Sequence, residues 1–406
     1  MKMAFRLLDI DQPKRQQLEA VQFFVKEKND VFVQLPTGFG KSACFQVLPL
    51  LFDIIHARSL YHMVLVICPL ISIIENQVDF LTNHVVGAVD LTKVAVERWH
   101  QATQNVQVLF STPEQLLTPT GLKPEAKELL RSLQPRCVGL ILDEVHTVVK
   151  WGDDFRPEYG LLARIHDLLS CQVMSLTATA TGPIVKEIRK RFSGPSSPFH
   201  HIREDPSRPN ITLTIRPWNR VRGEVVSLFR EFIEKGQGLP RTVLFFNNFR
   251  LMGEALLLLQ TVFKQFPQLE EHFALYHALR DRDRLKVLLQ GMTADDGVGG
   301  VRLLFASSAF GMGVDVPGIT RVWHVEAPHE LDDYVQQIGR AARRPGTTAE
   351  AVLFSRTTAD LEASMKGYVK NASQCRHQII KTYFEFPGEP TAISGPCCDV
   401  CQTIEN

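Results

Sequence analysis

The sequence predicts an α/β protein with two doubly wound parallel-sheet domains in tandem, followed by a small helical C-terminal segment. In the first half, short apolar stretches end in small or polar residues and lead into helical stretches, which is the rhythm of βαβ units. A cluster of Gly, Pro and Ser at 194–198 interrupts this rhythm, which then restarts. The C-terminal residues 351–406 lose the rhythm and gather cysteines.

Buried strands are expected in the first half because each candidate is apolar on both faces, as strands of parallel sheets are. They lie at 31–33, 63–68, 106–110, 138–142 and 173–176. A helix with one apolar face is expected over 14–27, and a buried helix over 43–52. In such a sheet, ligands bind beyond the carboxyl ends of the strands.

The second half repeats the pattern, so a second sheet of the same kind is expected. Helices are expected over 251–266 and 279–291, and strands at 243–246, 273–276, 301–305 and 322–325. The simplest architecture that fits this repeat is two similar halves with a cleft between them. The predicted domains are residues 1–193, 194–350 and 351–406.

The composition is that of a globular protein of two or three domains. Its 45 Lys and Arg residues nearly balance 44 Asp and Glu, so any nucleic-acid-binding surface would be local. The apolar run 59–74 is shorter than a membrane span and contains Pro69, and the N-terminus lacks a signal-peptide core. Single cysteines in apolar runs are expected to be reduced core thiols: Cys44, Cys68, Cys137 and Cys171.

A glycine-containing turn stands between the first strand and the helix after it. Small residues let backbone N–H groups approach a phosphate, Lys41 and the helix N-terminus add positive charge, and Ser42 can ligate Mg²⁺. The strict phosphate-loop pattern has Gly where Leu35 stands, so a chance Gly-Lys-Ser in a turn is the alternative. The candidate nucleotide-binding residues are Pro36, Thr37, Gly38, Phe39, Gly40, Lys41 and Ser42.

Two carboxylates, Asp143 and Glu144, follow the fourth strand. Mg²⁺ prefers hard oxygen ligands that it shares with ATP phosphates, so Asp143 suits the metal and Glu144 suits polarising the attacking water. We expect His146 to report the nucleotide state to Thr177 and Thr179. Asp-Glu alone is equally typical of a helix N-terminus, but a phosphate loop on the same sheet favours catalysis.

Further polar residues complete a candidate ATPase. Gln17, ahead of the loop, has an amide whose donor and acceptor suit an adenine edge. In the second half, Gln336, Arg340 and Arg343 share one face if their run is helical, and such arginines can neutralise a phosphoryl group in transfer. A basic helix end is the alternative. The Gly-rich stretch 309–315 suits a loop that contacts backbone.

Taken in order, these motifs resemble the catalytic core of a RecQ-family DNA helicase of superfamily 2, over nearly the whole chain. Most are common to helicases at large, but 151–159 resembles the aromatic-rich loop of this family. The resemblance implies that single-stranded DNA is coupled to hydrolysis by that loop, where aromatic side chains stack on bases for about 1–3 kcal/mol each. The implied coupling residues are Trp151, Phe155, Arg156, Thr177 and Thr179.

The resemblance also implies two RecA-like domains that use ATP and Mg²⁺, with Asp315 contacting the nucleotide. It implies 3′-to-5′ movement on single-stranded DNA and unwinding of forked or duplex DNA in recombination and repair. A location in the nucleus is implied and a location in the cytoplasm is left open. No association with a membrane is expected. The alternatives are an RNA helicase, which the aromatic loop and cysteines disfavour, and a non-hydrolysing DNA-binding scaffold, which the intact catalytic charges disfavour.

The second family-specific feature is a group of cysteines near the C-terminus: Cys375, Cys397, Cys398 and Cys401. Four soft ligands suggest one structural Zn²⁺. Core thiols are the alternative, but 387–406 is too polar and too rich in Pro and Gly for a core. The adjacent second and third cysteines resemble the Werner branch, and His377 is a less suitable substitute ligand.

Some positions depart from the family pattern, although none removes a catalytic charge. Lys14 replaces an Arg, Val145 an Ala, Gln337 a Glu and Ala342 a Gly, while Asp153 replaces a His and is expected to weaken coupling to DNA. Longer RecQ proteins continue into a winged-helix domain, so the chain is either a minimal form or a fragment. Strand separation is therefore less supported than translocation.

Overall fold

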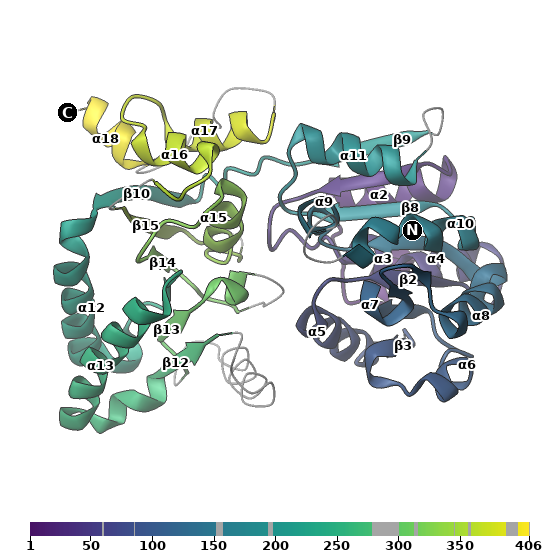
Figure 1. Ribbon diagram of the computed structural model, residues 1–406, viewed down its shortest axis with the longest axis horizontal. Helices are drawn as coiled ribbons and strands as arrows, with labels where there is room; N and C mark the ends of the chain where they lie inside the picture. The colour runs from purple at the N-terminus through teal and green to yellow at the C-terminus, as the bar shows by residue number, and fades with distance from the viewer. Residues whose placement is uncertain are drawn as a thin grey trace. The chain divides into compact units, whose positions relative to one another are not determined.

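The computed structural model describes residues 1–58, 61–84, 86–151, 157–193, 198–277, 300–311, 316–344, 346–355, 359–386 and 397–405. The chain forms two compact units, Met1–Glu204 and Asp205–Asn406, each built on one parallel sheet (Figure 1). The expected fold class, two RecA-like sheets with a C-terminal helical segment, is confirmed.

The helices of the first unit are α1 Lys2–Arg6, α2 Arg15–Lys26, α3 Ala43–Gln46, α4 Leu48–Ile55, α5 Ile71–Thr82, α6 Trp99–Ala102, α7 Pro113–Leu116, α8 Pro124–Leu133, α9 His146–Trp151, α10 Ala163–Leu169 and α11 Gly182–Phe192. Its strands are β1 Asp30–Gln34, β2 Met63–Ile67, β3 Ala88–Asp90, β4 Val108–Ser111, β5 Leu117–Thr118, β6 Gly121–Leu122, β7 Cys137–Leu142, β8 Val173–Thr177 and β9 Phe199–Arg203.

The helices of the second unit are α12 Val221–Lys235, α13 Phe249–Gln265, α15 Leu331–Ile338, α16 Ala363–Lys370, α17 Arg376–Tyr383 and α18 Asp399–Glu405. Its strands are β10 Ile211–Pro217, β11 Thr242–Phe245, β12 Phe273–Tyr276, β13 Leu303–Ala306, β14 Arg321–His324 and β15 Ala349–Ser355.

The first sheet has the strand order β3-β4-β2-β7-β8-β1-β9. The five predicted strands are confirmed as β1, β2, β4, β7 and β8, whereas the edge strands β3 and β9 were not predicted. Successive residues of β1 enter opposite cores, since Val31 and Val33 pack on one face of the sheet and Phe32 on the other. This two-sided burial explains why the central strands are apolar throughout.

The single helix predicted over 43–52 is wrong, because α3 and α4 are separate helices with Val47 between them. Pro49 lies in the first turn of α4. Since proline has no backbone N–H, it is tolerated at a helix start but interrupts a helix interior. The chain therefore restarts the helix at Leu48.

The second sheet has the order β10-β15-β14-β11-β13-β12. The predicted strands are confirmed as β11, β12, β13 and β14, and β10 and β15 were not predicted. The helix predicted over 279–291 lies outside the described residues. The domain boundaries at 193/194 and 350/351 stay predictions; β9, which follows the first of them, pairs with β1.

The C-terminal helices α16, α17 and α18 lie beside β10 and β15 at one end of the second unit (Figure 1). Tyr368, Ile380 and Cys398 belong to the same core as one face of the second sheet. A bridge from Leu213 of β10 to Cys398 extends the backbone pairing. Among the described residues, no helix has both the length and the apolar character needed to cross a membrane.

Candidate functional site

The glycine-containing turn runs from the end of β1 to the start of α3. Gly38 and Gly40 have φ angles of 78° and 89°, a region that side chains with a Cβ rarely adopt. A Cβ on Gly40 would also lie 2.7 Å from the Gln17 amide nitrogen. Leu35, the departure from the strict pattern, is fully buried in the core. A buried leucine therefore stands where the strict pattern has its first glycine. Gly38 and Gly40 keep the part of the turn that would face a phosphate free of side chains.

Gln17 holds this turn from α2. Its Oε1 accepts a hydrogen bond from the Lys14 backbone N–H, and its Nε2 donates to the carbonyl of Gly40, both at 2.8 Å. Lys14 Nζ donates to the Phe39 carbonyl at 3.0 Å and lies 4.0 Å from the centre of the Phe39 ring. The Nε2 end of the Gln17 amide thus supports the loop while its Oε1 caps the start of α2, and recognition of adenine by Gln17 stays a prediction.

Lys41 and Ser42 are held at the end of the turn. Lys41 Nζ donates to the Leu35 carbonyl at 3.1 Å, which folds the side chain over its own loop. Ser42 Oγ accepts a hydrogen bond from Gln77 Nε2 of α5 at 2.8 Å. Gln77 was missed by the sequence reasoning, because an amide on a helix face carries no motif. The turn therefore offers an ammonium group and a hydroxyl at one place.

Asp143 and Glu144 form a turn after β7, and α9 begins only at His146, so the pair is not inside a helix. Glu144 has a φ of 47°, and its buried Oε2 has no hydrogen-bond partner among the described residues. Burial, and then the charge of Glu144, raise the pKa of Asp143 to about 7, while Lys41 opposes the rise. This crowding of negative charge fits a divalent cation, which would relieve it.

His146 joins the carboxylate turn to the end of β8. Its Nδ1 lies 2.8 Å from Thr177 Oγ1 and 3.5 Å from Glu144 Oε2. The Thr177 hydroxyl donates to the Thr179 carbonyl and accepts from the Thr179 N–H, each at 3.0 Å. Because the Thr177 hydroxyl donates to the Thr179 carbonyl, we assign the proton of the contact with Thr177 to His146 Nδ1. His146 therefore contacts the threonine turn, and its expected role of reporting the nucleotide state stays a prediction.

The predicted DNA-coupling residues divide into two groups. Thr177 and Thr179 are fully buried, so they can act on DNA only through other residues. Trp151 ends α9, and its side chain, like Phe155 and Arg156, lies outside the described residues. Asp315 also lies outside the described residues.

In the second unit, the helix predicted to carry both arginines is shorter than expected. Gln336 lies on α15, which ends at Ile338, and Ala342 has a φ of 48°. Arg340 and Arg343 therefore lie on a loop after the helix, so the condition for a helical face shared with Gln336 is not met. Gly339 at the helix C-cap keeps a right-handed φ of −61°, and the left-handed conformation follows at Ala342.

The second unit also contains a cavity of about 790 Å³ beyond the carboxyl ends of β11 and β14. Asn247, Asn248, Phe249 and His329 are among its lining residues. Phe249, the first residue of α13, is 59% exposed. The sequence reasoning missed this cavity, although the polar pair directly after a buried strand was a signal for it.

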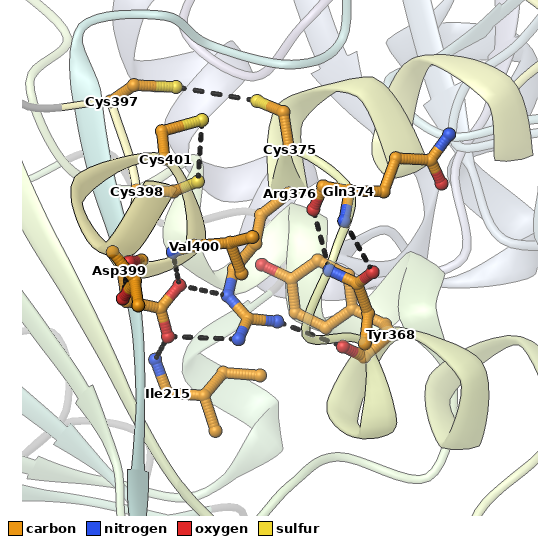
Figure 2. Close-up of polar contacts among 12 residues, drawn as sticks. Ile215, Tyr368, Gln374, Cys375, Arg376, Cys397, Cys398, Asp399, Val400 and Cys401 are labelled. Atoms are coloured by element: carbon orange, nitrogen blue, oxygen red, sulfur yellow. Dashed lines mark hydrogen bonds and ion pairs between the residues drawn. The ribbon is translucent and has the colours of Figure 1, made fainter. Parts of the chain in front are cut away.

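The cysteines expected to bind metal converge at the starts of α17 and α18 (Figure 2). The sulfurs of Cys375, Cys397, Cys398 and Cys401 all lie within 4.8 Å of one another. Tetrahedral zinc with Zn–S bonds of about 2.3 Å separates its sulfurs by about 3.8 Å. Burial, and then Cys398 and Cys375, raise the pKa of Cys401 to about 12. The donor set therefore fits a zinc ion, whose charge would favour the thiolates.

One expectation about this segment is corrected, and the position of His377 agrees with another. Cys398 is fully buried and packs in the core with Val400, so its surroundings are less polar than the sequence indicated. His377 Nδ1 contacts the Ser207 carbonyl at 2.8 Å and its Nε2 the Cys397 carbonyl at 3.3 Å. Both ring nitrogens face backbone oxygens, so His377 is not a metal ligand in this arrangement.

A partly buried ion pair fixes the cysteine segment to the sheet (Figure 2). Arg376 donates to both carboxylate oxygens of Asp399, at 2.5 and 2.9 Å, and to the Tyr368 carbonyl at 3.0 Å. Asp399 also accepts from the backbone N–H of Ile215 on β10 at 2.9 Å. A two-point guanidinium–carboxylate contact fixes direction as well as distance. It therefore holds the start of α18 at the edge of the second sheet.

Two protein-family models match the chain. Residues 14–188 match the DEAD/DEAH box helicase model, and residues 224–345 match the helicase conserved C-terminal domain. The first match contains the phosphate loop and the Asp143–Glu144 pair, and the second contains Arg340 and Arg343.

Curated relatives match nearly the whole chain. ATP-dependent DNA helicase Q1 of Mus musculus is 26% identical over 96% of this chain and 60% of that protein. ATP-dependent DNA helicase RecQ of Bacillus subtilis is 29% identical over 83% of this chain and 52% of that protein. ATP-dependent helicase wrn-1 of Caenorhabditis elegans is 27% identical, with 93% and 36% covered. The chain thus spans about one third to three fifths of these relatives.

Solved structures share the fold. The helicase MrfA bound to DNA has a TM-score of 0.70 at 17% identity, covering 90% of this chain and 52% of that chain. Dbp5 of S. cerevisiae bound to RNA has a TM-score of 0.64 at 13% identity, with 95% and 91% covered. At such identities the likeness shows the arrangement of strands and helices alone.

Proposed function

The chain belongs to the RecQ family of helicases, with a DEAD/DEAH-box domain followed by a helicase C-terminal domain, and from this premise we propose that it is an ATP-dependent motor on DNA. The motor moves 3′ to 5′ along single-stranded DNA and separates duplex strands. The observation that carries the proposal is the meeting of phosphate loop, carboxylate pair and histidine–threonine link at the carboxyl edge of one sheet.

ATP is the substrate of the first unit. Lys41 and the backbone N–H groups around Gly38 and Gly40 bind its phosphates. Ser42 and Asp143 would hold Mg²⁺, which when bound neutralises charge that develops on the phosphate oxygens. Glu144, whose buried Oε2 makes no hydrogen bond within the described part of the chain, orients and polarises the attacking water.

Hydrolysis also needs positive charge opposite the phosphoryl group in transfer. We assign this role to Arg340 and Arg343 of the second unit, which act only when ATP is bound. Gln336, buried on α15, is assigned to the same group as a supporting polar residue. Hydrolysis then changes the interaction of the two units with the nucleotide, and that change drives the step along DNA.

The link from His146 to Thr177 is the proposed coupling between hydrolysis and DNA. Thr177→Val removes the hydroxyl that accepts the His146 proton, at nearly constant volume. We expect ATP hydrolysis without DNA to change less than about threefold and its stimulation by single-stranded DNA to fall about tenfold, a loss of about 1.4 kcal/mol. ATPase assays with and without an oligonucleotide measure both quantities.

The control is Thr177→Ser, which keeps the hydroxyl and should keep the stimulation. Full stimulation in Thr177→Val would contradict the coupling role. An equal loss in both threonine variants would point instead to packing of the γ-methyl group.

Zinc is proposed for the four-cysteine cluster as a structural ion, since four protein ligands leave no open position for a substrate. We propose DNA recombination and repair as the setting and the nucleus as the location, as the family resemblance implies. The solved structures bound to RNA share only their fold with this chain. An RNA substrate is therefore one possible outcome of the experiment below.

The deciding experiment uses partial duplexes with a 3′ or a 5′ single-stranded tail. We expect ATP-dependent unwinding of the 3′-tailed and forked DNA only, and stronger ATPase stimulation by DNA than by RNA. Unwinding from the 5′ tail alone would reverse the polarity. Stronger stimulation by RNA would make the chain an RNA helicase, and binding of DNA without ATP hydrolysis would leave the scaffold alternative.

A further inference from the structure

We propose that Arg208 is a positioning residue for Arg340 and Arg343, because its guanidinium holds the loop that carries them. The inference rests on the proposed function, in which both arginines act on the phosphoryl group. Arg208 lies in the segment 205–210, which leads into β10. It belongs to none of the motifs that the sequence indicated.

The arginine loop needs an anchor because it follows the end of a helix. α15 ends at Ile338, and carbonyls at its end accept from the backbone N–H groups of Gly339, Arg340 and Ala341. The carbonyls that an anchor can satisfy are therefore those of the loop itself. Ala342 adds a left-handed φ of 48°, which residues other than glycine adopt at an energetic cost. A cation placed at these carbonyls would satisfy them and hold this conformation.

Arg208 supplies that cation. Its Nη1 donates to the Gly339 carbonyl at 3.2 Å, and its Nη2 donates to the carbonyls of Ala341 and Ala342 at 2.9 and 2.8 Å. These carbonyls lie on both sides of Arg340 in the sequence. A rigid, planar guanidinium can hold several acceptors in a fixed geometry, whereas an ammonium group is a single point of charge.

The position of Arg208 has features that stability alone would not favour. Burial, and then the charge of Arg343, lower the pKa of Arg208 to about 10, so two like charges face each other. Arg208 itself has a left-handed φ of 51°. Strain and like charges at one place are typical of functional sites.

Helix α17 fixes the segment that carries Arg208. His377 Nδ1 contacts the Ser207 carbonyl at 2.8 Å, and Lys381 Nζ lies 3.2 Å from Asp205 Oδ2. Asp205 Oδ1 in turn accepts from the Ser207 N–H at 2.8 Å. His377 and Lys381 are almost completely buried. The cysteine segment and the arginine loop are therefore joined through one short stretch of chain.

Arg208→Lys tests the role with little change in charge. We expect kcat for ATP hydrolysis to fall about tenfold or more, while KM for ATP and the affinity for a fluorescent ATP analogue stay within about twofold. If Arg208 only supported the fold, a variant with the wild-type thermal midpoint would not lose kcat while it kept KM and the affinity for the ATP analogue. The matched control is Arg222→Lys, an exposed arginine on α12, which should keep wild-type kcat.

A double-mutant cycle sharpens the test. In an Arg343→Lys background, where kcat is already low, Arg208→Lys should lower it by less than about twofold, since residues that act as a unit are not additive. A full further loss would overturn the proposal, and so would wild-type kcat in Arg208→Lys alone. Absence of ATP hydrolysis in the wild type would instead be a failure of the proposed function.

If Arg208→Lys does not fold, Asn210→Ala replaces it. Asn210 Nδ2 donates to the carbonyls of Ala342 and Thr347, both at 3.1 Å, so it anchors the same loop beside Arg208. We expect a kcat about threefold to tenfold lower at unchanged KM. Wild-type kcat in Asn210→Ala would overturn the proposal.

Discussion

Replacing Lys41 by alanine should lower DNA-stimulated ATP hydrolysis at least about 100-fold, the scale for losing one charged group that stabilises a transition state. Lys41 stands at the start of α3 and is folded over the phosphate loop by its bond to the Leu35 carbonyl. No other group of the loop carries a full positive charge, and its Gly38 and Gly40 positions contribute only backbone N–H groups. Steady-state ATPase assays with single-stranded DNA measure the loss.

Two further variants make this result specific. Lys190→Ala changes an exposed lysine on α11 and should keep wild-type turnover. Glu144→Gln should bind ATP normally but hydrolyse it at least about 100-fold more slowly, because an amide cannot polarise water as a carboxylate does. Undiminished turnover in Lys41→Ala would remove the assignment of the phosphate loop.

Replacing Cys398 by serine should release zinc and lower the thermal midpoint of the second unit by about 10 °C or more. Structural zinc supplies on the order of 10 kcal/mol in isolated zinc fingers, and about 1 kcal/mol moves the midpoint of a domain this size by roughly 2–4 °C. The contacts of Tyr368 and Ile380 with the sheet core retain part of the stability. Zinc analysis per chain and scanning calorimetry measure both effects.

The matched control is Cys171→Ser, which alters a half-buried thiol of the first unit and should leave the zinc content at one ion per chain. A Cys398→Ser chain with one zinc and the wild-type midpoint would contradict the metal site. Folded wild-type protein without zinc would do the same.

Much of the architecture was predictable because parallel strands are buried on both faces. The continuous apolar runs that became β1, β2 and β7 could not occupy a solvent-exposed position. The edge strands β3 and β9 were not predicted, because strands that are only half-buried lack such a continuous apolar run. Residues of β9 such as His200 and His201 are only half-buried, so they carry little of the apolar signal.

The sequence by itself determined the chemistry that each strand end carries. Lys41 and Ser42 follow β1, Asp143 and Glu144 follow β7, and the terminal cysteines are four soft ligands. The tertiary structure alone decided how these groups are held. The amide of Gln17 and the three bonds of Arg208 join positions far apart in the chain. Such contacts depend on how orphan carbonyls and buried charges find partners after packing, which no local pattern encodes.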